Sequence, residues 1–447
     1  AVGRRLPQRP ALAGLNPAGA QLRVAAARAV LQVLQGRSLK AALAQERAAF
    51  ADPRDRALLE AICHGAVRHR RSLEFALGRF LAQPVERRDP LAHALLLAGL
   101  TQLHVLALPA HAAVSATIEA ARLLGRGARA GLINAVLRRS QREGLPESDD
   151  PGVRGNHPEW LLRQLQQDWP QDWQGMLDAN NAQAPLWLRV NGRRSTRAAV
   201  SAMLQDAGIA HHLPAFPPQA IRIDEAIAPT RLPGWDEGLI TVQDVSAQLA
   251  AEALAPGAGA QVLDLCAAPG GKAAQLAERD PAQLVLIDID AERLQRVHDL
   301  FGRLQLETAA VRFAAADAAL PLPDALPTAY DAILLDAPCS ATGIIRRQPD
   351  VKWHRQPKDI ASLNALQWRL LKNAWRHLRP GGRLLYSTCS VLKAENENLA
   401  AQFLAQNPDA RALPLDARFG RVSGVGRQRL PGENDGDGFF YVLFERI

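Results

Sequence analysis

Two cysteines, Cys339 and Cys389, are the residues of this sequence best suited to covalent chemistry. Cys339 stands in Asp-Ala-Pro-Cys-Ser and Cys389 in Ser-Thr-Cys-Ser, and each follows an apolar run that predicts a strand. Because only a minor fraction of a free thiol is ionised at neutral pH, a site that uses one as a nucleophile must favour the thiolate. The alternative is that both are small buried hydrophobic residues, which fits poorly with two strand ends that are each flanked by serine.

The segment from Cys266 to Lys272 predicts a loop that binds a small-molecule cofactor. It follows a predicted strand and opens a predicted helix, and Gly270 and Gly271 let the backbone and the helix amides approach a ligand closely. A dinucleotide-binding loop would need Gly-x-Gly-x-x-Gly, which is absent. A P-loop would need glycine at position 266 and Ser or Thr at position 273, which are Cys and Ala here.

Two aspartates follow the next predicted strands and could contact a nucleoside. Asp288 ends the strand after the loop, where a carboxylate can accept both ribose hydroxyls. An ordinary helix cap is the alternative for Asp288, and we favour the ligand because the position lies at the ligand-facing edge of a sheet. Asp317 follows the weaker strand 311–313 and could accept from an adenine amino group, although a plain loop position explains it equally well.

Methylation of cytosine at C5 is a reaction that needs such an arrangement. C5 is a poor nucleophile, but addition of a thiolate to C6 makes an enamine whose C5 can attack an electrophilic methyl group. Loss of the C5 proton and elimination of the thiol complete the reaction. The site must therefore hold a cysteine near the methyl donor and a group that manages protons.

The elements expected to position these residues form a multidomain chain. Residues 1–19 predict a basic tail, residues 20–146 an all-α bundle, residues 153–235 a small α+β module, and residues 236–447 a doubly wound, Rossmann-like α/β domain. The prediction of the last domain depends on short apolar runs that are typical of strands buried on both faces, at 262–265, 284–287, 333–335 and 383–386. Residues 439–444 predict a final strand.

Single residues support this division. In the bundle, Cys63 lies on an apolar stripe at helical spacing and is predicted to be core. In the small module, residues 186–190 alternate like a strand, and Thr196 predicts the cap of a helix that ends at Asp206.

Composition limits the class of protein. A chain with 48% hydrophobic and 22% charged residues fits a globular protein, and four scattered cysteines argue for a reducing compartment and against a disulfide framework. The most apolar stretch, 91–108, contains His93 and Gln102, so it predicts a buried helix and not a membrane span. We expect a cytoplasmic protein without a signal peptide, membrane segment or metal site.

Basic residues suggest a phosphate-rich partner. Residues 1–150 carry 22 Lys+Arg against 12 Asp+Glu, although 47 of the chain's 53 basic residues are Arg, so an arginine-biased composition explains the excess equally well. The candidate RNA contacts are Arg189, Arg193 and Arg194, which we predict to be exposed, together with Arg346, Arg347, Lys352 and Trp353. The arginines would hold phosphates and the tryptophan would stack on a base. The alternatives are a solvated surface for the first group and a packed loop for the tryptophan.

The combined motifs resemble the RNA m5C methyltransferases, through residues 264–272, 288–290, 336–343 and 387–390. In that family the Thr-Cys-Ser cysteine attacks C6, which implies this role for Cys389. The Pro-Cys cysteine, here Cys339, assists release of the covalent adduct, and Asp336 is placed near the cofactor and the base. The resemblance implies S-adenosylmethionine as cofactor, held by Cys266, Ala267, Ala268, Pro269, Gly270, Gly271, Lys272, Asp288, Asp317 and Asp336.

The resemblance extends over nearly the whole chain. Residues 20–146 resemble the NusB-type RNA-binding domain, and residues 345–353 and 430–440 match a bacterial branch that acts on 16S rRNA. It implies cytosine 967 of free or early-assembly 16S rRNA as substrate, a monomer, and neither DNA nor a membrane as partner. DNA cytosine-C5 methyltransferases use the Pro-Cys thiol as nucleophile, and the second thiol argues against them. A NusB-like antitermination factor with a non-catalytic methyltransferase domain, and the same chemistry on tRNA, stay open.

Overall fold

The computed structural model describes residues 17–447, which divide into two compact units. The first contains the chain up to Pro158 together with Gln348–Asp350, and the second contains Glu159–Arg347 and Val351–Ile447. The predicted tail at 1–19 lies almost wholly outside the described residues. Among residues 17–447, no helix has both the length and the apolar character required to span a bilayer.

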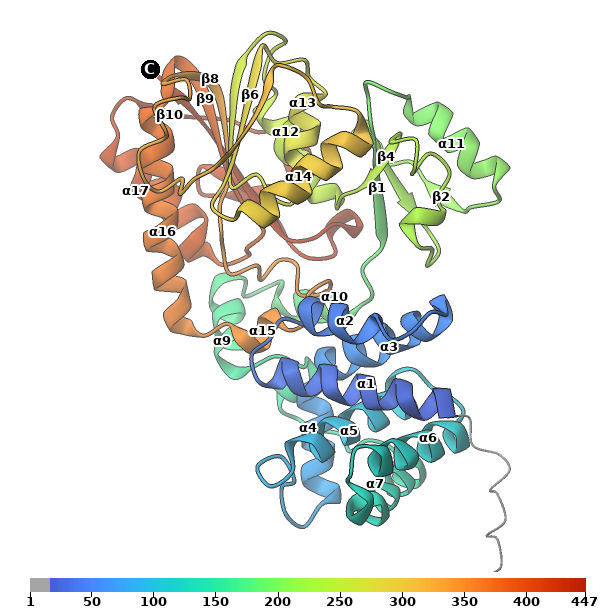
Figure 1. The fold of residues 1–447 in the computed structure, drawn as a ribbon. Helices are drawn as coiled ribbons and strands as arrows, with labels where there is room; N and C mark the ends of the chain where they lie inside the picture. Colours follow the sequence, from blue (N-terminus) through green and yellow to red (C-terminus); the bar gives the residue numbers. More distant parts are fainter. Residues whose placement is uncertain (1–16) are drawn as a thin grey trace, which may run out of the picture. The chain divides into compact units, whose positions relative to one another are not determined.

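The first unit is all helical (Figure 1). Proline occupies the first turn of α3 and α5, where its missing N–H costs nothing, and Asp52 and Asp89 cap these two helices. The predicted apolar stripe of α3 is buried, and Cys63 on it is core as predicted. The helices are α1 (Pro17–Leu34), α2 (Leu39–Arg47), α3 (Pro53–Arg68), α4 (Arg70–Phe80), α5 (Pro90–Leu100), α6 (Ala110–Leu123), α7 (Ala130–Glu143) and α8 (Pro151–Arg154).

The second unit begins with two helices and a small antiparallel sheet. The strand order is β2-β3-β1-β4, and α11 follows β1. The prediction for α11 is confirmed, because the Thr196 hydroxyl accepts from the Ala199 amide at 3.2 Å and the helix ends at Asp206. The elements are α9 (Glu159–Asp168), α10 (Trp173–Asn181), β1 (Leu186–Val190), α11 (Arg197–Asp206), β2 (His211–His212), β3 (Ala220–Ile223) and β4 (Ile240–Val242).

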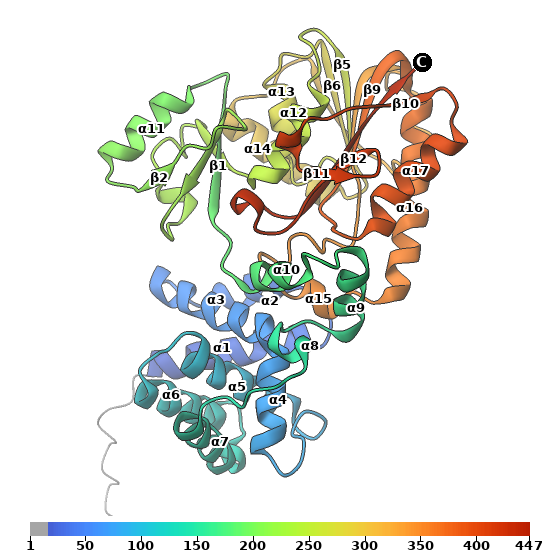
Figure 2. The same cartoon turned by 180° about the vertical axis from the view of Figure 1, so that it is seen from behind.

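The larger sheet is doubly wound, as predicted. Its order is β11-β12-β13-β9-β8-β5-β6-β7, with β10 paired to β13, and the chain moves outward from β5 first through β6 and β7 and then through β8 and β9. Strands β5 to β9 are parallel, and β10 to β13 add antiparallel pairs (Figure 2). The strands are β5 (Gln261–Leu265), β6 (Gln283–Asp288), β7 (Val311–Ala315), β8 (Tyr330–Asp336), β9 (Leu378–Thr388), β10 (Ala410–Leu413), β11 (Arg421–Ser423), β12 (Gly426–Arg429) and β13 (Phe439–Arg446).

Helices cover both faces of this sheet. One face packs against α12 (Val245–Leu254), α13 (Gly271–Ala277) and α14 (Ala291–Leu304), and the other against α16 (Pro357–Arg376) and α17 (Glu397–Gln406) (Figures 1 and 2). The short helix α15 (Val351–His354) precedes α16. Two buried layers therefore fix the sheet, and the polar loops are left at its ends.

A buried ion pair joins the small sheet to the cofactor loop. Arg189 of β1 is fully buried and pairs with Glu278, and its guanidinium also donates to Gln243 Oε1 at 2.7 Å and to the Gly271 carbonyl at 3.4 Å. The prediction that Arg189 is exposed is therefore wrong. β1 is buried on both faces from Trp187 to Val190, so this side chain has no solvent-facing side, and the carboxylate of Glu278, the residue after α13, compensates its charge.

We expect Arg189→Ala to lower the free energy of unfolding by about 3–5 kcal/mol, because it leaves Glu278 buried without its partner. Arg193→Ala is the matched control on the same segment, since Arg193 is exposed and should change stability by less than about 0.5 kcal/mol. Urea denaturation of both variants measures the difference. Equal stability of the two variants would contradict the structural role of Arg189.

Candidate active site

The site lies where the parallel strands end. Cys266, Asp288, Asp336 and Cys389 end or directly follow β5, β6, β8 and β9. Because these strands are parallel, their carboxyl ends share one edge of the sheet, and β5 and β8 flank the point at which the strand order reverses. Ligands of doubly wound sheets bind at this point.

The predicted cofactor loop packs closely against α14 at Gly270. Gly270 has a φ of +101°, and a Cβ there would lie 3.0 Å from the Val297 side chain, so only glycine fits without movement of α14. Helix α13 starts at Gly271 and directs its first amides toward the loop. Burial raises the pKa of the Cys266 thiol, which makes Cys266 an unreactive part of the loop.

Asp288 binds the backbone of the cofactor loop. It is almost fully buried, and its Oδ2 accepts from the Ala268 amide at 3.1 Å while its Oδ1 accepts from the Asp290 amide at 3.1 Å. Asp290, and not Asp288, caps α14 by accepting from the Glu292 and Arg293 amides. Asp317 lies two residues beyond β7 and accepts from the Ala319 amide at 2.9 Å.

Asp264 is a buried carboxyl group at the same edge, within the motif but absent from the predicted site residues. It is 1% exposed, and neither of its oxygens has a hydrogen-bond partner. Burial, with the negative charge of Asp336 adding to it, raises the pKa of Asp264 well above its ordinary value.

The thiols of Cys339 and Cys389 are in contact. Cys339 Sγ and Cys389 Sγ lie 3.4 Å apart, within sulfur hydrogen-bond distance, and Cys389 is the more exposed of the two. Asp336, on the strand between β5 and β9, accepts from Lys272 Nζ at 2.7 Å and from the Ser387 hydroxyl at 3.0 Å. The structure thus brings together the predicted catalytic residues and the last residue of the cofactor loop.

Electrostatics distinguish the two thiols. The hydrogen bond to Cys389 and burial raise the pKa of the Cys339 thiol well above its ordinary value. Burial alone would lower the pKa of Lys272, but the adjacent Asp336, with Cys389 adding to it, holds that pKa above its ordinary value. The Lys272 ammonium therefore interacts electrostatically with Cys389, whereas the raised pKa of Cys339 keeps that thiol protonated.

Sequence reasoning missed Glu395, a fully buried residue behind both thiols. Its carboxylate accepts from the hydroxyls of Ser340 and Ser390, the residues that follow Cys339 and Cys389. Only its position, six residues beyond Cys389 in a loop expected near the sheet edge, could have indicated it.

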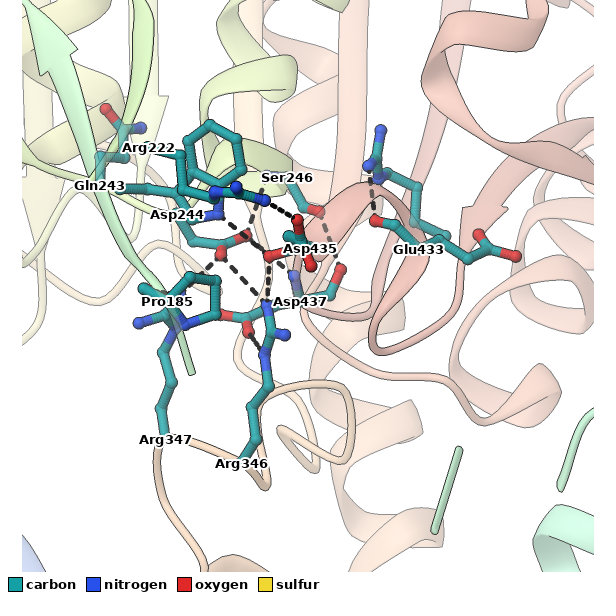
Figure 3. Close-up of polar contacts among 12 residues, drawn as sticks. Pro185, Arg222, Gln243, Asp244, Ser246, Arg346, Arg347, Glu433, Asp435 and Asp437 are labelled. Carbon is teal, nitrogen blue, oxygen red and sulfur yellow. Dashed lines mark hydrogen bonds and ion pairs between the residues drawn. The ribbon is translucent and has the colours of Figure 1, made fainter. Parts of the chain in front are cut away.

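A buried ion cluster holds the loop that follows Cys339. Arg346 and Arg347 point at Asp437, with Arg346 Nε 2.5 Å from Oδ1 and Arg347 Nε 2.6 Å from Oδ2, and Arg347 also contacts Asp244 at 2.8 Å (Figure 3). Burial, with Asp244 adding to it, raises the pKa of Asp437 to about 6. The cluster ties the start of α12, the thiol loop and the loop before β13 together.

Backbone contacts complete this connection. The Gly343 amide donates to the Cys389 carbonyl at 2.9 Å, and the Gly438 amide donates to the Gly343 carbonyl at 2.8 Å. A Cβ on Gly343 would lie 2.2 Å from the Gly438 carbonyl oxygen, so the three segments can approach only with glycine there.

These contacts correct the expected RNA contacts. The charges of Arg346 and Arg347 are taken up by protein carboxylates, and Lys352 is fully buried with its Nζ 3.1 Å from Asn181 Oδ1. All three are therefore withdrawn as phosphate contacts. Arg346, Arg347 and Lys352 follow the Cys339 loop and help to hold it in place. The sequence alone does not distinguish a basic residue that pairs with a protein carboxylate from one that faces solvent.

Arg193 and Arg194 are exposed, as predicted for the small module, and Trp353 is half-buried with the Lys352 ammonium 5.3 Å from its ring. Among residues 17–447, no cluster of three or more His, Cys, Asp or Glu side chains is arranged to hold a metal ion.

The fold and site together define a class: a doubly wound methyltransferase-type domain with two thiols at its ligand edge, joined to a small α+β module and a helical unit. Family models match residues 251–445 (16S rRNA methyltransferase RsmB/F), 157–230 (the RsmF/B-like ferredoxin-like domain) and 20–142 (the NusB family). Each matched range lies inside one of the three predicted domains.

The chain is 51% identical over 431 residues to the ribosomal RNA small subunit methyltransferase B of Xanthomonas campestris pv. campestris. The aligned residues make up 95% of this chain and 97% of that protein. It therefore belongs to the 16S rRNA methyltransferase RsmB/F family, and the resemblance inferred from the motifs is confirmed.

Two solved structures share the fold. The crystal structure of PH0851 has a TM-score of 0.83 at 22% identity and covers 97% of this chain and 99% of that chain. The crystal structure of a methyltransferase homolog protein from Pyrococcus horikoshii has a TM-score of 0.59 at 28% identity and covers 67% of this chain and 98% of that chain.

The raised pKa of Asp264 predicts a pH-dependent effect of Asp264→Asn. The unfolded carboxyl titrates near 3.8, so the neutral folded group contributes stability that is present below that pH and lost as the pH rises toward the folded pKa. Above about pH 4, the stability of Asp264→Asn relative to wild type should therefore increase by about 1.4 kcal/mol per pH unit. Denaturant unfolding over a pH series measures this slope, and a pH-independent difference would show that Asp264 is ionised.

Proposed function

We propose that the chain transfers a methyl group from S-adenosylmethionine to C5 of a cytosine in 16S rRNA, through a covalent bond between Cys389 and C6. The observation that supports this most directly is the 3.4 Å approach of two thiols at the ligand-facing edge of a doubly wound sheet. Membership in the RsmB/F family supports the class of reaction and the RNA substrate.

The residues at this edge fit the proposed cofactor. Residues Cys266–Lys272 would hold it together with Asp288, Asp317 and Asp336. The loop opens α13 beside the point at which the strand order reverses, which is where doubly wound sheets bind their ligands. When bound, S-adenosylmethionine supplies the electrophilic methyl group.

The protein's own residues then perform the following steps. Cys389 Sγ would bond to C6, and the C5–C6 electron pair would then take the methyl group from the sulfonium sulfur, whose bond to that carbon breaks as S-adenosylhomocysteine is released. Transfer of the C5 proton to solvent would restore the C5–C6 double bond and expel Cys389 as a thiolate, which Cys339 can stabilise by donating a hydrogen bond across 3.4 Å. The Lys272 ammonium stabilises negative charge on Cys389 before attack and after release.

The proposed target is cytosine 967, by family resemblance, in free or early-assembly 16S rRNA. The base must leave its stack to reach Cys389, at a cost on the order of a few kcal/mol that is smallest in a hairpin loop. Arg193, Arg194 and Trp353 remain the proposed RNA contacts. A monomer acting in the cytoplasm is the simplest setting for this substrate.

We expect Cys389→Ala to abolish methyl incorporation into 16S rRNA from a strain that lacks this enzyme, with little change in cofactor affinity. Cys63→Ala is the matched control, because Cys63 is a buried core residue of the first unit and should retain full activity. Labelled methyl counts, with mapping of 5-methylcytosine in the product, measure both. Undiminished turnover by Cys389→Ala would refute the assignment. If wild type methylates tRNA and not 16S rRNA, the substrate is tRNA. If wild type methylates neither RNA, the result favours a non-catalytic RNA-binding factor.

Cys339→Ala should accumulate a protein–RNA adduct, because the leaving Cys389 sulfur loses its hydrogen-bond donor. The adduct should appear as a slow band in a denaturing gel and should be absent from the double variant Cys339→Ala/Cys389→Ala. Adducts that form without Cys389 would mean that the two thiols have exchanged roles.

A further inference from the structure

One buried carboxylate accepts hydrogen bonds from both thiol loops. Glu395 Oε2 accepts from the Ser340 hydroxyl at 2.5 Å and from the Ser390 hydroxyl at 2.6 Å. Glu395 Oε1 accepts from the Ser340 amide at 2.8 Å and from Gln367 Nε2 at 3.0 Å. Since an ionised carboxylate has about four acceptor positions, this group is fully used.

The loops thereby connected are the ones that carry the reacting sulfurs. Ser340 follows Cys339 and Ser390 follows Cys389, so a single side chain spans the two positions that determine the distance between the sulfurs. Glu395 is itself held in place, because the Tyr386 hydroxyl donates to its backbone carbonyl at 2.8 Å. Movement of either loop would break at least one charge-assisted hydrogen bond.

The charged groups around the thiols are distributed unevenly. The Lys272 ammonium, paired with Asp336, acts on Cys389. The Glu395 carboxylate acts on Cys339 and adds to the hydrogen bond and burial that raise the pKa of that thiol. Arg355 faces the same loop, donating to the carbonyls of Ser340 at 3.1 Å and Cys339 at 3.5 Å, and its charge is thus directed at the backbone.

We propose that Glu395 is a positioning residue that holds the two thiol loops together and keeps the shared proton on Cys339, so that Cys389 is the sulfur available for attack. This inference rests on the proposed role of Cys389 as nucleophile. The two parts of the role, geometry and charge, can be separated by substitution. Glu395→Gln keeps the shape and one acceptor but removes the charge, whereas Glu395→Ala removes both.

Alkylation of the RNA-free protein measures where the proton resides. Iodoacetamide reacts with thiolates, and mass spectrometry of the peptides gives the ratio of label on Cys389 to label on Cys339 over a pH series. Wild type should be labelled mainly on Cys389. In Glu395→Gln the share on Cys339 should rise by about tenfold, which corresponds to one pKa unit.

Methyl transfer to 16S rRNA measures the geometric part. Glu395→Ala should lower kcat by about a hundredfold, because displacement of a reacting group by about 1 Å has an effect of that size. The KM for S-adenosylmethionine should stay within about twofold of wild type. Glu395→Gln should recover most of the lost kcat while keeping the altered labelling ratio.

Glu278→Gln is the control for loss of a buried carboxylate. Glu278 is also buried and accepts from Arg189 and from the Gly192 amide, but it has no hydrogen bond to a thiol loop. It should lower the melting temperature and leave the labelling ratio unchanged. The inference is overturned if both Glu395 variants match this control in labelling and lose activity only in proportion to stability.

Failure of the proposed function would look different. A wild-type protein that does not methylate RNA, or a fully active Cys389→Ala, would remove the proposed function, whereas the labelling ratio would still test Glu395. If Glu395→Ala does not fold, Glu395→Gln decides the charge part alone, and an unchanged labelling ratio in that variant overturns the inference.

Discussion

Parallel pairing of β8 with β9 is the constraint on which the site depends. The register places Asp336 opposite Ser387, so that Cys339, three residues beyond one strand end, and Cys389, two residues beyond Ser387, leave the sheet side by side. A shift of one residue would turn the alternating side chains to the opposite face and separate the two sulfurs. The apolar layers on both faces of the sheet maintain this register, because any shift would expose buried aliphatic side chains.

Buried ion pairs in the second unit fix loops that lack the regular backbone hydrogen bonds of helices and strands. Arg189 with Glu278, Lys272 with Asp336, and the cluster of Arg346 and Arg347 with Asp437 each join segments from different parts of the chain. Buried ion pairs contribute little net stability, because desolvation opposes the attraction, but removing one partner is costly. Such pairs therefore favour one arrangement of the loops over others, which a site with two reacting sulfurs requires.

Local pattern was sufficient for much of the fold. The apolar runs of the parallel strands, the cap at Thr196 and the core position of Cys63 were all correctly placed, because burial on both faces, hydrogen bonding at a helix start and helical spacing leave direct marks on neighbouring residues. Cys266, Asp288, Asp336 and Cys389 lie at strand ends as expected, because the same apolar pattern marks where each strand stops.

What the sequence determined by itself was therefore the doubly wound domain, the position of the two thiols at strand ends and the loop that opens α13. Only the tertiary structure decided the partners of the charged residues. Arg189 and Arg346 are buried against carboxylates that are distant in sequence, and Glu395 reaches both thiol loops from a short turn beyond β9. The physical reason is that periodicity reports which face of an element is apolar, whereas an ion pair or a shared carboxylate depends on distances between segments that only the packed sheet brings together.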